Sequence, residues 1–150
     1  MRIVLQRVTS CGLRIEGQDF SRIGYGLLLL VSIEEADNSE DVEWLCNKIT
    51  GLRVFDDELG VMNLDIRDIG GDIMVVSQFT LHASIRKGNR PSYTKAARPD
   101  FAKSLYESFI QSIEISLDRK VATGQFGAQM EITLVNDGPV TIFIDTKNRE

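Results

Sequence analysis

The sequence has few of the residues that build metal and redox sites. Its 150 residues include one histidine, His82, and two cysteines, Cys11 and Cys46, which lie far apart in the chain. A zinc or iron site needs several imidazole or thiolate ligands together, so such a site is nearly excluded. We expect no metal and no cofactor, and we expect both cysteines to be buried thiols. A Ser-His-Asp triad would depend on His82 alone.

Long apolar stretches are also missing. The longest apolar run is Leu27 to Val31, far short of the roughly 20 residues that span a bilayer. The N-terminal segment carries Arg2 and Arg7 where a secretory signal would be apolar. The sequence therefore predicts a cytoplasmic protein that has no membrane partner.

A net positive charge is absent as well. The chain has 17 basic and 22 acidic residues, a formal net charge of -5 and a pI of about 5.0. Nucleic-acid partners usually need a basic surface, so the average charge argues against them. Stretch 86–98 departs from this average, because it contains several basic residues and no acidic residue. It is interpreted either as a solvated loop or as a surface for a phosphate-rich partner.

The remaining composition is that of a globular protein. Hydrophobic residues make up 43% of the chain and charged residues 26%. A chain of this length buries enough surface to fold without a disulfide or a metal. No linker, repeat or low-complexity stretch divides the sequence, so we expect one domain over residues 1–150.

Apolar stretches bounded by glycines and turn residues predict strands. Stretch 26–33 is apolar without alternation, which is typical of a strand covered on both faces. A turn at 136–139 would separate the last two strands. The expected strands are residues 3–9, 12–17, 26–33, 52–55, 73–79, 130–134 and 140–144.

Two helices are predicted, each with one apolar stripe. The first has a cap at Asn38 or Ser39 and ends at Gly51 in the left-handed conformation, and the second begins near Pro99. Because strands outnumber helices, we predict an α/β fold in which mixed β-sheet layers are packed on one side by two helices. The stripes are Val42, Leu45, Cys46 and Ile49 in the first helix, and Phe101, Leu105, Phe109 and Ile113 in the second.

Two short segments are candidates for chemistry. Ser77-Gln78-Phe79-Thr80-Leu81 places polar residues at the end of an apolar strand, where α/β folds bind ligands, although a strand emerging into a loop gives the same pattern. Asn136-Asp137-Gly138-Pro139 is either a simple turn or a rigid element whose backbone approaches a ligand. Glycine permits such an approach because it has no side chain.

These segments together resemble the D-aminoacyl-tRNA deacylases over essentially the whole chain. The resemblance rests, in chain order, on Gln6-Arg7-Val8, Ser77-Gln78-Phe79-Thr80-Leu81, Arg90-Pro91-Ser92 and Asn136-Asp137-Gly138-Pro139-Val140-Thr141. It implies a three-layer β/β/α fold and a homodimer that acts on the 3′ end of aminoacyl-tRNA and not on DNA. The reaction would be hydrolysis of the ester between a D-amino acid, or glycine, and the terminal adenosine.

The resemblance also implies roles for individual residues. The catalytic segment would be Ser77, Gln78, Phe79 and Thr80, whose backbone N–H groups would hold the ester carbonyl. Gly138 and Pro139 would be joined by a cis bond and would enter the partner subunit's pocket, where their backbone excludes an L side chain. Arg7 would hold this element in place, and Phe126 and Met130 would pack around the terminal adenine.

Two other functions stay open from the sequence. One is a non-catalytic module that binds tRNA ends. The other is a general esterase that uses Ser77 or Thr80 with His82, because Thr80 and His82 would face one side of a strand. Thr80 is a poor candidate for a nucleophile because no base is evident beside it, whereas the ribose 2′-hydroxyl adjoins the scissile bond.

Overall fold

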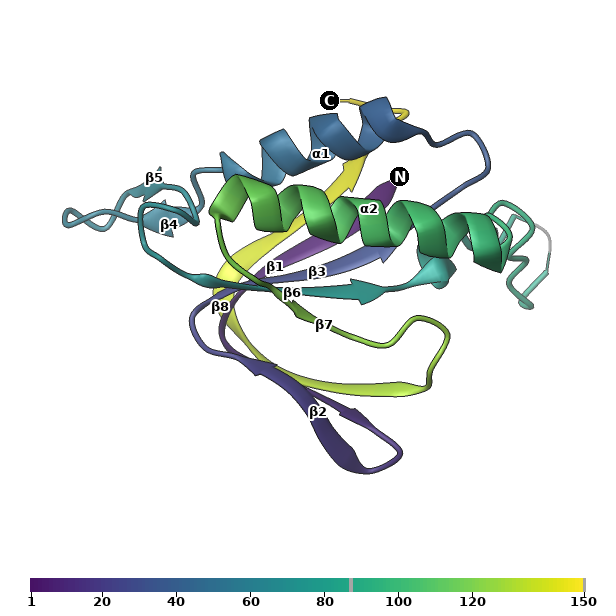
Figure 1. Ribbon diagram of the computed structural model, residues 1–150, viewed down its shortest axis with the longest axis horizontal. Coiled ribbons are helices and arrows are strands. Elements are labelled where there is room, and N and C mark those ends of the chain that lie inside the picture. Colours follow the sequence, from purple (N-terminus) through teal and green to yellow (C-terminus); the bar gives the residue numbers. More distant parts are fainter. Residues whose placement is uncertain (87, 150) are drawn as a thin grey trace.

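The computed structural model describes residues 1–86 and 88–149, so Lys87 of the basic stretch lies outside the described residues. Figure 1 shows how the elements are arranged. In chain order they are β1 (Arg2–Ile15), β2 (Gln18–Ile23), β3 (Gly26–Ser32), α1 (Ser39–Thr50), β4 (Phe55–Asp56), β5 (Met62–Leu64), β6 (Asp72–Ser77), the 3₁₀ helix η1 (Phe79–His82), α2 (Pro99–Leu117), β7 (Ala122–Thr123) and β8 (Met130–Asp145).

A mixed sheet organises these elements. Its strand order is β2-β1-β3-β6-β7, and β8 pairs with the other side of β1. β1 is antiparallel to β2, β3 and β8, whereas β3, β6 and β7 run parallel. The first half of β1 pairs with β3 and its second half with β2. The sheet therefore bends along β1, and β2 lies beneath β6 and β7 (Figure 1), where Ser21 Oγ donates to Thr123 O at 2.9 Å.

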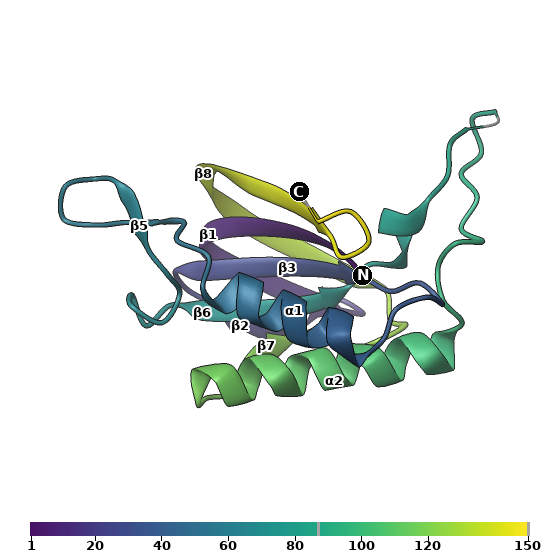
Figure 2. The ribbon, with the colours of Figure 1, turned by 90° about the horizontal axis from the view of Figure 1, so that it is seen from above.

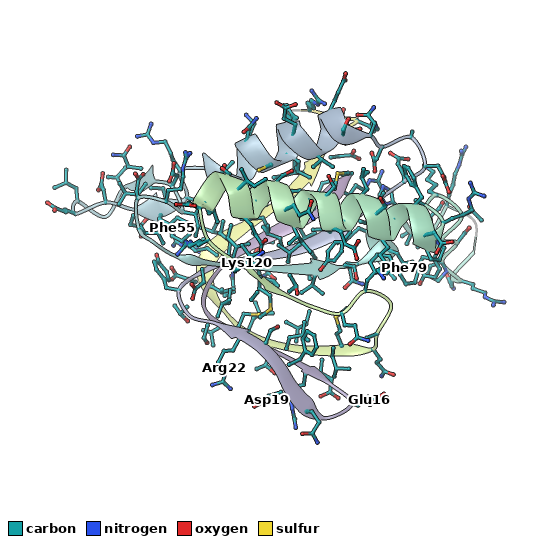
Figure 3. The ribbon with its side chains drawn as sticks, in the orientation of Figure 1. Glu16, Asp19, Arg22, Phe55, Phe79 and Lys120 are labelled. Carbon is teal, nitrogen blue, oxygen red and sulfur yellow. The ribbon has the colours of Figure 1, made fainter. Side chains whose placement is uncertain are left out.

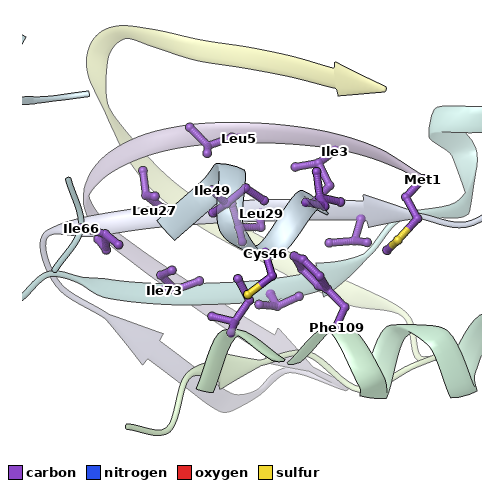
Figure 4. Close-up of a cluster of buried hydrophobic side chains, with 14 of the residues drawn as sticks. Met1, Ile3, Leu5, Leu27, Leu29, Cys46, Ile49, Ile66, Ile73 and Phe109 are labelled. Carbon is purple, nitrogen blue, oxygen red and sulfur yellow. The ribbon is translucent and has the colours of Figure 1, made fainter. Parts of the chain in front are cut away.

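Two apolar cores separate three layers. The larger core lies between the sheet and helices α1 and α2, as Figure 4 shows. The smaller core lies inside the bend of the sheet and includes Leu28, Met74 and Val76. Leu27 and Leu29 enter the first core while Leu28 enters the second, which explains why β3 is apolar without alternation. The predicted α/β fold, with sheet layers covered on one side by two helices, is confirmed.

Helix α1 forms as its sequence predicts. Asn38 caps it, since Asn38 Oδ1 accepts from the N–H groups of Glu40 and Asp41, and the Asp41 carboxylate accepts from the N–H of Asn38 at 3.0 Å. The left-handed conformation expected at Gly51 is wrong, because its φ is -99°. Its N–H still bonds to Asn47 O in the α-helical pattern, and the next N–H, of Leu52, bonds to Ile49 O in a tighter final turn.

The apolar stripe of α2 differs from the predicted one at its start. Phe101 is exposed, whereas Tyr106 is buried with Phe109 and Ile113. Tyr106 enters the core because its hydroxyl donates to Val75 O at 2.8 Å, which satisfies its polar end.

Both cysteines are buried free thiols, as predicted. Among the residues that the structure describes, no helix is long and apolar enough to cross a membrane.

The number of strands was predicted incorrectly at both ends of the chain. Stretch 3–9 and residues 12–15 of the next expected strand form the single strand β1, Glu16 and Gly17 form the turn after it, and the hairpin partner β2 was missed. Stretches 130–134 and 140–144 likewise form the single strand β8. The turn expected between two strands at 136–139 is wrong, because both halves of β8 pair with β1 in one direction. Residues 137–140 have no partner on β1 and form a bulge between Asn136 and Thr141, which pair with Val8 and Gln6.

We expect Phe109→Ala to lower the free energy of unfolding by about 3–5 kcal/mol, because its ring is fully buried between α2 and the sheet. Urea denaturation measures this. Ile115→Ala on the same helix is the control, since that side chain is 81% exposed, and it should change the free energy by less than about 0.5 kcal/mol. A loss below about 1 kcal/mol for Phe109→Ala would contradict the assigned core.

Candidate active site

A pocket opens where the parallel strands β3 and β6 end. Its volume is about 570 Å³, and its walls are mostly apolar with a few polar groups, which is typical of sites for small ligands. Four segments contribute: the end of β3, the turn after β6, the start of α2 with the stretch before it, and the chain from Phe126 to Ile132. The lining residues include Ser32, Ser77, Gln78, Phe79, Tyr93, Tyr106, Phe126 and Met130.

The turn after β6 presents backbone donors beside this pocket. Gln78 N donates to Val31 O at 2.7 Å and extends the β3–β6 ladder by one bond, after which η1 begins. Among the hydrogen bonds of residues 1–86 and 88–149, none takes the N–H of Phe79 or of Thr80. These two N–H groups at the start of η1 are therefore available to a ligand oxygen.

The side chain of Thr80 is already paired. Its Oγ1 accepts a hydrogen bond from Gln78 Nε2 at 2.5 Å. The ring of Phe79 is exposed, and it meets Tyr93 edge-on with 5.1 Å between ring centroids. Figure 3 shows Phe79 at the end of the sheet next to the start of α2. The pocket-facing part of the predicted segment is thus Ser77, Gln78 and Phe79.

His82 does not lie where the esterase hypothesis requires. It belongs to η1 and not to a strand, so it does not share a strand face with Thr80. Its ring is fully buried, with Nδ1 2.6 Å from Ser32 Oγ. Burial, together with the charge of Arg2, holds the pKa of His82 below its ordinary value. The strand geometry assumed for a Thr80–His82 pair is therefore wrong.

Phe126 and Met130 also line the pocket. Both are partly buried, and the Phe126 ring packs against Tyr106 with 5.8 Å between centroids. Burial raises the pKa of the Tyr106 hydroxyl. Tyr106 was missed as a pocket residue, although its spacing from Phe109 and Ile113 is that of one helix face. Ser32 was missed because nothing in an apolar strand distinguishes it.

Gly138 and Pro139 lie far from this pocket. Arg7 pairs with Leu27 near the start of β3, whereas Ser77 pairs with Val31 near its end, so the two places are about 13 Å apart along the sheet. Phe55, a neighbour of the Arg7 site, and Phe79 lie at opposite ends of the molecule in Figure 3. The structure therefore does not bring Arg7, Gly138 and Pro139 together with Ser77 within one chain.

The Gly138–Pro139 element is nevertheless rigidly held. Its peptide bond is cis, and both residues are exposed. Arg7 is buried, and its Nε lies 3.2 Å from Asp137 O and 2.9 Å from Asp137 Oδ2, while its Nη1 donates to Val54 O at 2.6 Å. Asn136 Nδ2 donates to Arg7 O and to Val140 O. These contacts tie both sides of the element to β1.

The basic stretch borders the pocket. Backbone bonds of 2.8 and 2.9 Å join Ser84 to Ser92, and the chain projects from the body before α2 begins (Figure 2). Arg86, Arg90 and Lys95 are exposed and have no ion pair among the described residues. Tyr93, in the same stretch, lines the pocket.

The described residues hold no cluster of three or more His, Cys, Asp or Glu side chains that could bind a metal.

The bent mixed sheet, with two helices on one side and a pocket at its strand ends, defines an α/β class that solved structures share. A c-Myc DNA unwinding element binding protein has 36% identity and a TM-score of 0.90, covering 97% of this chain and 98% of its own. A probable eukaryotic D-amino acid tRNA deacylase has the same fold, with 16% identity and a TM-score of 0.82 over 95% of this chain and 97% of its own.

The chain belongs to the D-Tyr-tRNA(Tyr) deacylase family, whose model matches residues 4–145. Its relatives include the D-aminoacyl-tRNA deacylases of Bacteroides thetaiotaomicron, 58% identical, and Flavobacterium johnsoniae, 56% identical. Each comparison covers 100% of both chains. The predicted family, and with it the prediction of an ester hydrolase, is confirmed.

We expect the free energy of unfolding to fall as the pH is lowered from about 7 to about 5. The unfolded chain takes up a proton at His82 near a pH of about 6.5, whereas the buried imidazole stays neutral to lower pH because its pKa is lowered. The unfolded state then binds more protons in this window, so stability decreases with acidity.

Denaturation at a series of pH values measures this decrease. His82 is the only histidine of the sequence, so His82→Asn should remove the decrease above a pH of about 5. An equal decrease in the parent and the variant would assign the effect to other groups.

Proposed function

We propose that this protein hydrolyses the ester that joins a D-amino acid to the 3′-terminal adenosine of tRNA. The observation that carries the proposal is an apolar pocket lined by Phe79, whose backbone N–H and that of the adjoining Thr80 are unpaired among the described residues. An ester carbonyl bound there would meet donors that are already oriented toward the charge that develops during attack. The names of the relatives that match the whole chain support the same substrate class.

The chemistry needs no side-chain nucleophile. Water adds to the ester carbonyl, the bond to the ribose oxygen breaks, and that oxygen takes a proton. The Thr80 hydroxyl accepts a hydrogen bond from Gln78, and His82 is buried against Ser32. His82 is therefore not placed to act as a base that activates Thr80. The neighbouring 2′-hydroxyl of the ribose can assist attack by water, and positioning by the pocket then supplies the acceleration.

Phe126 and Met130 are proposed to hold the terminal adenine. They line the same pocket as the turn after β6, so one cavity would take both the base and the ester. Stacking of a base on an aromatic ring contributes about 1–3 kcal/mol. Partial exposure leaves the ring of Phe126 accessible for this contact.

Discrimination against L-amino acids is proposed to come from a second copy of the chain. Gly138 and Pro139 are exposed and too distant to enter the pocket of their own chain. Within the described residues, β8 pairs only with β1, and its exposed side chains include Val135 and Phe143. An apolar strand with a free edge supports docking of two copies through this region, which would place the element of each copy in the pocket of the other.

A backbone element selects by exclusion. Carbonyl groups beside the substrate α-carbon would clash with an L side chain, whereas a D side chain would point away and glycine would have none. The contacts of Arg7 and Asn136 support this role, because steric exclusion requires a backbone segment that is held rigidly in place.

The tRNA body is proposed to meet the basic stretch. Arg86, Arg90 and Lys95 are exposed in the stretch whose residues Tyr93, Ala96 and Ala97 line the pocket, and they can contact phosphates of the acceptor stem. The rest of the chain is acidic, so binding should be weak and should depend only modestly on salt.

The direct test is incubation of the purified protein with D-tyrosyl-tRNA and with L-tyrosyl-tRNA. We expect hydrolysis of the D ester and of glycyl-tRNA, and an intact L ester. Equal cleavage of both stereoisomers would reject the chiral filter. Binding without cleavage of either would favour the alternative, a non-catalytic module that binds tRNA ends.

Replacement of Gly138 by alanine tests the filter itself. The new methyl would lie about 3.0 Å from Asn136 Oδ1, a contact that a small shift relieves, so we expect folding to be retained. It would occupy the partner's pocket, so we expect D-ester hydrolysis to fall by about 100-fold or more.

Gly12→Ala is the matched control, because no atom lies within 4 Å of its added methyl. Both variants should keep the parent's melting temperature, and only Gly138→Ala should lose hydrolysis. Unchanged hydrolysis in Gly138→Ala would exclude a filter built from this backbone.

A further inference from the structure

The 3₁₀ helix η1, which follows the proposed ester-binding segment, ends in a buried polar residue, His82. The side chain of His82 is completely buried, and its Nε2 has no hydrogen-bond partner in the described part of the chain. Its other nitrogen, Nδ1, lies 2.6 Å from Ser32 Oγ, which in turn lies 3.2 Å from Phe79 O. A buried, half-paired imidazole is costly, so its presence here needs an explanation.

Taken together, the two contacts favour one neutral tautomer of His82. Phe79 O can only accept, so the Ser32 hydroxyl must donate to it. Ser32 Oγ must then accept from His82, which requires the hydrogen on Nδ1 and leaves the lone pair of Nε2 unpaired. The opposite neutral tautomer would break the bond to Phe79 O. His82 Nδ1–H, Ser32 Oγ–H and Phe79 C=O thus form one directed chain.

This chain sets the orientation of the peptide between Phe79 and Thr80. Because that peptide is trans and planar, the C=O of Phe79 and the N–H of Thr80 point in opposite directions. A carbonyl held toward the buried Ser32 therefore turns the Thr80 N–H away from the core. That N–H has no hydrogen-bond partner among the described residues, and it directly follows Phe79, which lines the pocket.

The surroundings keep this arrangement in one state. Arg2 Nη1 donates to Leu81 O at 3.0 Å, which holds a second carbonyl of the same 3₁₀ turn. The positive charges of Arg2 and the N-terminal ammonium face His82 and oppose its protonation, whereas Glu34 and Asp37 favour it. Burial opposes protonation most strongly, and a neutral imidazole is the form that the directed chain requires.

We propose that Ser32 and His82 are positioning residues for the hydrolysis described above, acting through the Phe79 carbonyl to aim the Thr80 N–H at the ester oxygen. Neither residue touches the reacting atoms. The inference rests on the proposed function for its consequence in catalysis, whereas the orientation of the peptide can be observed without substrate.

Single-turnover deacylation of D-tyrosyl-tRNA by Ser32→Ala, His82→Leu and His82→Asn tests the catalytic part. Misdirecting one donor should cost less than removing it, so we expect a loss of about tenfold in the rate constant for Ser32→Ala and His82→Leu, with half-saturation unchanged within about twofold. His82→Asn should stay within about threefold of the parent, because the asparagine amide can donate to Ser32 Oγ from a similar position.

The double variant Ser32→Ala, His82→Leu distinguishes a directed chain from two separate structural roles. We expect it to be no slower than the slower single variant, because either change already interrupts the chain. Multiplied losses, or a loss in His82→Asn equal to that in His82→Leu, would overturn the proposal. Thr50→Val is the control: it removes a buried hydroxyl that donates to Cys46 O at 3.0 Å in α1, and it should not change the rate.

The amide resonance of Thr80 in nuclear magnetic resonance spectra gives a second readout, which needs no activity. It should move in Ser32→Ala and His82→Leu and stay in place in Thr50→Val. An unmoved resonance in both folded variants would overturn the proposal even if the parent is an active deacylase. A parent that cleaves no ester, with the resonance moving as expected, would instead reject the proposed function and with it the role in catalysis.

Discussion

Antiparallel pairing of β1 with β8 is the constraint on which the rest of the structure depends. β8 pairs with β1 from Arg2 to Ile15, so the two strands bend together. The first half of β1 also pairs with β3, and its second half pairs with β2. The bend creates the second apolar core and the three layers. It also leaves Gly138 and Pro139 at one end of the sheet and the Ser77 turn at the other.

Backbone groups, and not reactive side chains, form both parts of the proposed site. At each part, a buried polar side chain orients the backbone. Arg7 is nearly inaccessible and binds the carbonyls of Val54 and Asp137, with Asp137 also supplying a balancing charge. His82 is neutral and acts on the Phe79 carbonyl through Ser32. Groups held in this way keep their direction without reorganising when charge develops, which is the condition for electrostatic catalysis.

The charge of the molecule is divided between the body and the stretch before α2. The net charge of -5 includes the basic residues of 86–98, so the rest of the chain is more acidic than the total suggests. An acidic body repels the phosphates of a tRNA except where the basic stretch meets the pocket. This distribution suits an enzyme that engages the end of a tRNA and releases it after one hydrolysis.

Local patterns in the sequence determined the two helices, the continuously apolar strand β3 and the segments that identify the family, because capping, periodicity and short motifs are properties of neighbouring residues. Tertiary structure decided where the chain continues and where it turns, since 136–139 stays in β8 only because β1 offers pairing on both sides of it. It also decided the burial of Tyr106, whose hydroxyl needed Val75 O. His82 became a buried neutral group, rather than a candidate base, through Ser32 on a distant strand, and no local pattern encodes such a long-range hydrogen bond.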